Sequence, residues 1–180
     1  MQPEEVVQLR EVVVDAARRI FPGCGIEVGE AREPQEEAPD TKRLVAVMGF
    51  SGDVLRGSMA LVAPMELMRD AYPLPLKASG WELDVFDWSG EIANRLLGRI
   101  RNALAERGVE VAPSTPRVLY AERLQAVGSM RRTICTVAFP SKTSWIEVWF
   151  DALAPEGRVV LSPADPNRVA PPEGDVLLFD

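Results

Sequence analysis

An uninterrupted helical period over residues 83–107 constrains the fold more than any other feature of this sequence. At about 100° per residue, the apolar side chains of this segment fall on one stripe and its polar side chains fall roughly opposite. We therefore predict a long helix whose apolar stripe packs on a core. The stripe consists of Phe86, Ala93, Leu96, Leu97, Ile100 and Leu104, and the opposite face carries Asp87, Glu91, Asn94, Gly98, Arg101, Asn102 and Ala105.

The patterns in the rest of the chain place this helix in an α+β domain. Apolar periodicity predicts a first helix over 3–21, stopped by Pro22-Gly23, and a short helix over 64–71. Because most strand-to-strand connections are short, we expect a mainly antiparallel sheet with the long helices packed on it. The expected strands are 42–49, 55–62, 117–125, 133–139 and 144–150, the first two joined by a turn at 49–53.

The domain is predicted to span residues 1–161 and to be followed by a proline-rich tail over 162–180. The apolar end of this tail, residues 176–179, has two interpretations of about equal weight. It either docks on a sheet edge or forms a strand within its own domain. Residues 29–42 are polar and acidic, and they are predicted to form a surface connection.

Charge and composition limit the classes of partner and site. The net charge of -7 argues against nucleic acid or an anionic membrane, because either needs a basic patch. Histidine is absent, which removes Ser-His-Asp and Cys-His arrangements and histidine-ligated metals. Cys24 and Cys135 are expected to be reduced, buried thiols. With no signal-peptide pattern and no long apolar run, the chain is expected in the cytoplasm.

Glu91 and Asn94 lie one turn apart on the predicted polar face. A carboxylate pairs with lysine or arginine, and a side-chain amide both donates and accepts, so that it can orient a water molecule. Such a pair suits hydrolysis of a phosphoryl group that is activated elsewhere, where positioning and charge stabilisation supply much of the catalysis. The same spacing is more often found on an ordinary solvated helix face, so spacing alone does not name a function.

Asp87, Glu91, Asn94 and Gly98 form the pattern Asp-x-x-x-Glu-x-x-Asn-x-x-x-Gly, which resembles the CheC/CheX/FliY family of bacterial chemotaxis phosphatases. The first helix has Val14 where a second asparagine would be, so the chain is more similar to single-site CheX than to two-site CheC. Further support comes from glycine-punctuated segments at 49–52 and 56–61, which look like the family's hairpin, and from Pro116 before the next strand.

The resemblance implies a phosphatase that acts on the aspartyl phosphate of a CheY-like response regulator. In that role Asn94 orients the attacking water and Glu91 pairs with the receiver's lysine. Asp87 takes the variable acidic or hydroxyl position, and together with Gly98 and Arg101 it is predicted to contact the partner. The magnesium ion belongs to the receiver, so no metal or cofactor is expected on this chain.

Two other roles remain open. The same helix in a non-catalytic adaptor would bind a receiver without accelerating hydrolysis, and a structural component of a signalling assembly is a third interpretation. Retention of both Glu91 and Asn94 favours the enzyme. Because CheX-like proteins dimerise, the resemblance also implies a possible homodimer. Arg95 and Arg99 make this helix more basic than the simplest family pattern, which allows a different choice of partner.

The predicted strand over 144–150 alternates strictly between two faces. Trp145, Glu147 and Trp149 share one of them. The favoured interpretation is that a helix covers this tryptophan side. The alternative is an interface, since tryptophan is enriched at binding hot spots.

Overall fold

The computed structural model describes residues 3–34, 42–76, 79–121, 133–141, 144–165 and 168. Helix α3 is the long helix that the periodicity predicts, shifted slightly toward the N-terminus. In chain order the elements are α1 (Pro3–Gly23), β1 (Arg43–Ser51), β2 (Arg56–Pro64), α2 (Met65–Asp70), α3 (Trp81–Ala105), β3 (Ala112–Pro113), β4 (Arg117–Ala121), β5 (Thr133–Ser141) and β6 (Ser144–Leu153).

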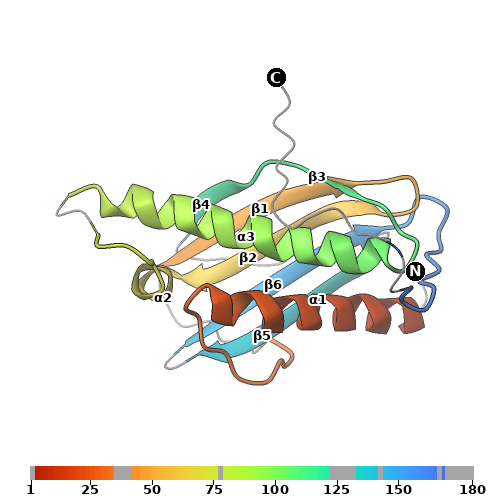
Figure 1. The fold of residues 1–180 in the computed structure, drawn as a ribbon, viewed down its shortest axis with the longest axis horizontal. Helices are drawn as coiled ribbons and strands as arrows, with labels where there is room; N and C mark the ends of the chain where they lie inside the picture. The colour runs from red at the N-terminus through yellow and green to blue at the C-terminus, as the bar shows by residue number, and fades with distance from the viewer. Residues whose placement is uncertain are drawn as a thin grey trace.

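Within the described residues the strands form one six-stranded sheet in the order β3-β1-β2-β6-β5, with β4 paired to β1 on the same side as β3. Every one of these strand pairs is antiparallel. Helices α1 and α3 cross the same face of the sheet, antiparallel to each other (Figure 1). The chain therefore has the α+β architecture that the sequence predicts.

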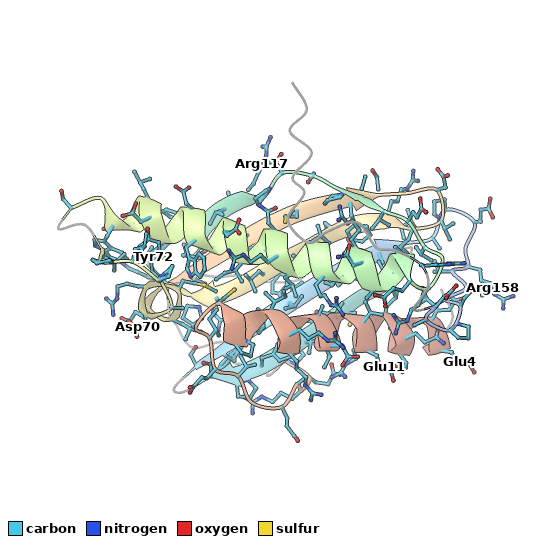
Figure 2. All side chains as sticks on the ribbon, in the orientation of Figure 1. Glu4, Glu11, Asp70, Tyr72, Arg117 and Arg158 are labelled. Carbon is cyan, nitrogen blue, oxygen red and sulfur yellow. The ribbon has the colours of Figure 1, made fainter. Side chains whose placement is uncertain are left out.

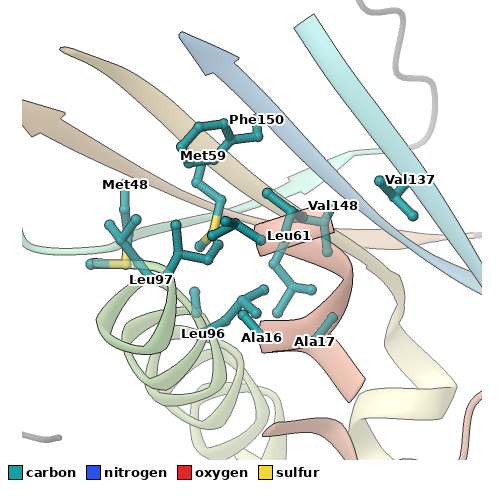
Figure 3. Close-up of a cluster of buried hydrophobic side chains, with 14 of the residues drawn as sticks. Ala16, Ala17, Met48, Met59, Leu61, Leu96, Leu97, Val137, Val148 and Phe150 are labelled. Carbon is teal, nitrogen blue, oxygen red and sulfur yellow. The ribbon is translucent and has the colours of Figure 1, made fainter. Parts of the chain in front are cut away.

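The core lies between the sheet and these two helices. Alternation along the strands turns Met48, Leu61 and Val148 toward the helices, where they pack with Leu96 and Leu97 of α3 (Figure 3). The apolar stripe is thus confirmed, except that Phe86 is only partly buried. The stripe residues that are at most 1% exposed are Ala93, Leu96, Leu97, Ile100 and Leu104.

Helix α1 continues through Pro22-Gly23, where the sequence predicted it to stop. A proline in the last turn removes a single backbone donor, which a helix end tolerates. The chain reverses slightly later, at Gly25, whose φ of 74° favours glycine.

Strand β1 likewise continues through residues 50–51, beyond the predicted strand end at 49 and into the predicted turn. Burial explains the difference, because Phe50 is 4% exposed and its ring stacks on that of Phe150 with 4.8 Å between centroids. Phe50 also pairs with Pro113 of β3, a short strand that was not predicted. A proline is tolerated there because β3 lies at the edge of the sheet.

Asn102 was predicted on the polar face of α3, but it is 3% exposed. Helix α3 packs against α1 as well as against the sheet, and this second contact widens its buried arc beyond the apolar stripe. Oδ1 of Asn102 accepts hydrogen bonds from Nε and Nη2 of Arg101 at 3.4 and 3.3 Å. The buried amide oxygen is therefore satisfied.

Of the two long helices that the structure describes, neither covers the tryptophan side of β6, since α1 and α3 both lie on the opposite face of the sheet (Figure 1). The two indoles instead share a carboxylate. Trp145 Nε1 donates to Oε1 of Glu147 at 2.6 Å, and Trp149 Nε1 donates to Oε2 at 2.7 Å. A carboxylate with two indole donors can be buried without a helix above it.

Several predictions fall outside the described residues. They are the end of the strand over 122–125, the acidic segment over 35–41, and the tail beyond 165 apart from residue 168, including 176–179. The domain boundary at 161 stays a prediction. Of the helices in the described parts of the chain, none is long and apolar enough to cross a membrane.

Candidate functional site

A groove of about 380 Å³ lies between α3 and β4. Its α3 side presents the predicted carboxylate and amide residues. The opposite side is apolar and comes from the strand. The lining residues are Phe86, Asp87, Gly90, Glu91 and Asn94 on α3, with Pro116 and Val118 across from them. The structure therefore brings together three of the predicted site residues, Asp87, Glu91 and Asn94, beside one apolar wall.

Strand pairing builds the apolar wall. Val118 pairs with Ala46 of β1, and because Ala46 faces the helices, Val118 also points toward α3. A Cβ added to Gly90 would lie 3.5 Å from Cγ2 of Val118 and 3.6 Å from Cγ of Pro116, so the α3 backbone approaches β4 closely here. The sequence analysis did not identify Val118 as a site residue. The only available signal for this wall was the position of Pro116 just before the predicted strand.

Glu91 is engaged within its own helix. Nε of Arg95 donates to Oε1 of Glu91 at 2.7 Å, and the two side chains are 46% and 45% exposed. The guanidinium of Arg95 also lies 5.5 Å from the centroid of the Trp88 ring. Trp88 in turn meets Tyr72 edge-on, with 6.4 Å between centroids. A layer of aromatic and cationic groups, formed by Arg95, Trp88 and Tyr72, thus lies beside Glu91.

Figure 2 labels Tyr72 on the α2 side of α3 and Arg117 on the β4 side. Glu91 belongs to both arrangements, because it lines the groove and also bonds to Arg95. Trp88 and Tyr72 were not predicted as part of the site. The spacing of Glu91 and Arg95, four residues apart on a helix, was the available signal for their ion pair.

Two pKa shifts belong to this neighbourhood. The hydrogen bond to Glu91 raises the pKa of Arg95, and burial raises the pKa of the Cys24 thiol. The nearby Arg95 guanidinium opposes the shift at Cys24. Arg95 therefore stays charged and Cys24 stays neutral over the ordinary range of pH.

The remaining predicted residues, Gly98 and Arg101, lie further along α3 and do not line the groove. A Cβ added to Gly98 would meet nothing within 4 Å in the described chain. Packing against the described residues therefore does not require a glycine here. Arg101 is half-buried and bonds to Asn102, as described above.

The site offers an amide, two carboxylates and a cation, but no assembled metal centre. Among the described residues, no group of three or more His, Cys, Asp or Glu side chains could hold a metal ion. None of the groove residues is a strong nucleophile. The arrangement can orient water and pair with charges on another molecule.

Residues 44–139 match a family model described as chemotaxis phosphatase CheX. This match spans more than half of the chain. The chain belongs to the CheX family. The family match and the α+β fold thus agree with the resemblance to the wider CheC/CheX/FliY group. No curated protein matches the chain.

Solved structures of CheX and CheC-like proteins share the fold at low sequence identity. CheX from Vibrio vulnificus is 19% identical with a TM-score of 0.61, covering 80% of this chain and 93% of its own. A CheC-like protein from Shewanella is 16% identical with a TM-score of 0.63, covering 84% and 99%. CheX of Borrelia burgdorferi, solved in a complex with CheY, BeF3 and Mg²⁺, is 16% identical with a TM-score of 0.60, covering 79% and 96%.

Proposed function

We propose that this CheX-family chain is a phosphatase that hydrolyses the aspartyl phosphate of a CheY-like receiver and so ends its signal. The observation that carries the proposal is the groove in which Glu91 and Asn94 lie together, on an accessible helix face, beside the apolar wall of Pro116 and Val118. The complex of Borrelia burgdorferi CheX with CheY supports the class of partner.

In the proposed reaction Asn94 enters the receiver's active site and orients a water molecule through its amide. The water attacks phosphorus, and the bond from phosphorus to the aspartyl oxygen breaks. The products are inorganic phosphate and a free aspartate carboxylate. Magnesium held by the receiver neutralises the phosphoryl oxygens, and this chain binds no metal or cofactor of its own.

Glu91 pairs with a lysine of the receiver in this mechanism, in exchange for its contact with Arg95. The exchange costs little, because an exposed pair with this spacing contributes only about 0.3–0.5 kcal/mol. Asp87, Gly98 and Arg101 contact the receiver around the Glu91–Asn94 pair. A homodimer and a cytoplasmic location remain predictions.

The test follows loss of phosphate from a phosphorylated CheY-like receiver with Mg²⁺ present. We expect Asn94→Ala to reduce the acceleration by about 100-fold or more, because the water loses its positioning group. We expect Glu91→Ala to weaken receiver binding as well. Glu82→Ala is the matched control, since Glu82 is an exposed carboxylate on α3 outside the groove.

Two outcomes would contradict the proposal. Acceleration that survives in Asn94→Ala rules out the assigned role of the amide. Receiver binding by the wild-type chain without any acceleration selects the non-catalytic adaptor.

A further inference from the structure

Charges of opposite sign are segregated along α3. All of its carboxylates precede Asn94 and all of its arginines follow it. The helix macrodipole favours acidic groups only in the first turn and basic groups only in the last turn, and the last turn of α3 holds no basic residue. The macrodipole therefore does not account for the arginines. The carboxylates are Glu82, Asp84, Asp87 and Glu91, and the arginines are Arg95, Arg99 and Arg101.

The boundary between the two charges falls at the candidate site itself. Glu91 and Arg95 are one turn apart, about 6 Å along the helix axis. Both side chains are nearly half exposed, at 45% and 46%, so another protein can reach either. Asn94 lies between them in sequence and lines the same groove as Glu91.

Arg95 is well placed to exchange one partner for another. Its Nε bonds to Glu91, its guanidinium packs 5.5 Å from the centroid of the Trp88 ring, and it also neighbours the Cys24 thiol. A guanidinium carries five donors in a planar fork, which suits bidentate recognition of a carboxylate. When a cation from the receiver takes Glu91, the Trp88 ring can keep Arg95 in place beside it.

We propose that Arg95 is a specificity-determining residue that pairs with an acidic side chain of the receiver, next to the basic side chain that pairs with Glu91. This inference rests on the proposed function, since it assumes that a receiver docks on α3. Arg95 and Glu91 together select a receiver whose surface carries a cation and a carboxylate. The distance between these two groups matches the rise of about one helical turn. A receiver with the reverse order would face like charges at both positions, which opposes docking.

The affinity test uses a CheY-like receiver loaded with beryllium fluoride and Mg²⁺, which cannot be turned over. We expect Arg95→Glu to weaken binding by about tenfold, because an exposed attraction becomes a repulsion. Arg95→Lys keeps the charge and should lose less. Arg56→Glu makes the same change of net charge at an exposed residue of β2, outside α3, and should leave the affinity within about twofold.

A charge-swapped variant tests whether the order of the two charges along α3 matters when the net charge stays the same. Glu91→Arg combined with Arg95→Glu keeps the net charge and an ion pair on the same helical turn. We expect this double variant to bind at least about tenfold more weakly than wild type, with unchanged helix content by circular dichroism. We also expect one acidic-to-lysine substitution on the receiver to restore binding of Arg95→Glu.

Three results would overturn the inference: equal effects of Arg95→Glu and Arg56→Glu, wild-type affinity in the charge-swapped variant, or no rescue by any receiver substitution. Failure of the proposed function is measured separately, as the absence of acceleration by the wild-type chain at saturating concentration. Binding that depends on Arg95 without acceleration would retain the inference and reject the phosphatase.

Discussion

Arg43 of β1 and Glu147 of β6 form a buried ion pair across the intervening strand β2, with 3.1 Å between Nη1 and Oε1. Their side chains are only 5% and 9% exposed. The Arg43 guanidinium also lies 5.1 Å from the centroid of the Trp145 ring. Among the described residues, Glu147 accepts three hydrogen bonds, one from Arg43 and one from each of the two indoles. The Glu147 carboxylate thus links three side chains on the sheet face opposite α1 and α3.

This relationship predicts a large effect on stability. Glu147→Ala leaves the buried Arg43 charge without its partner and removes the acceptor of both indoles, so the free energy of unfolding should fall by about 3 kcal/mol or more. Glu147→Gln keeps an acceptor and should cost less. Urea denaturation measures both, with the exposed Glu156→Ala as control. A loss in Glu147→Ala no greater than in the control would show that the pair is not structurally important.

Gly57 of β2 predicts a second strong effect. A Cβ at this position would overlap the carbonyl oxygen of Asp151 on β6, a backbone atom that can move only if the strand pairing is disturbed. We therefore expect Gly57→Ala to lower the free energy of unfolding by about 3 kcal/mol. Gly23→Ala is the control, since a Cβ there meets nothing within 4 Å. Similar urea midpoints for the two variants would contradict the close approach.

The buried thiol of Cys135 leads us to expect that the free energy of unfolding depends on pH in the alkaline range. Burial raises the pKa of its thiol from 9.0 to about 11. Between these values the unfolded chain has released the proton and the folded chain still holds it. Stability therefore falls as pH rises through this window, by at most about 1.4 kcal/mol per pH unit for this thiol. Below pH 9.0 the thiol contributes no pH dependence, because both states are protonated.

Urea denaturation at a series of pH values tests this expectation. Cys135→Ala should show a shallower decline than wild type between pH 9.0 and about 11. The comparison is between slopes, since the substitution also changes packing in the core. Parallel curves for the two proteins would show that the thiol titrates at its ordinary pKa when folded.

The fold was largely predictable because its elements carry regular periods. The stripe of α3 repeats every turn, and the strands alternate between faces, so local sequence sufficed for element type and for antiparallel pairing. Burial that depends on distant contacts was not predictable. Asn102 is polar in sequence, yet α1 lies beside α3 and its amide is buried. The described helices α1 and α3 lie on the sheet face away from Trp145 and Trp149, and no local pattern says which face the helices take.

The candidate site was predictable on its α3 side only. Glu91 and Asn94 share a face by helical spacing, and the family resemblance supplied their proposed roles. The wall opposite them depends on the register that pairs Val118 with Ala46, a contact between segments far apart in the chain. The ion pair between Glu91 and Arg95 could have been predicted from their spacing on the helix. The contact between Arg95 and the Trp88 ring could be seen only in the structure.

Gly98 predicts that stability and receiver binding change in opposite directions. A Cβ there meets nothing within 4 Å, so Gly98→Ala should stabilise α3 by about 0.5–1 kcal/mol, as expected for glycine in a helix interior. If a receiver lies close over this position, Gly98→Leu should also raise the thermal midpoint but weaken receiver binding by about tenfold. Gly98→Ala is then the matched control, with a single methyl group in the interface. Wild-type affinity in Gly98→Leu would show that the open space above Gly98 is not used by the partner.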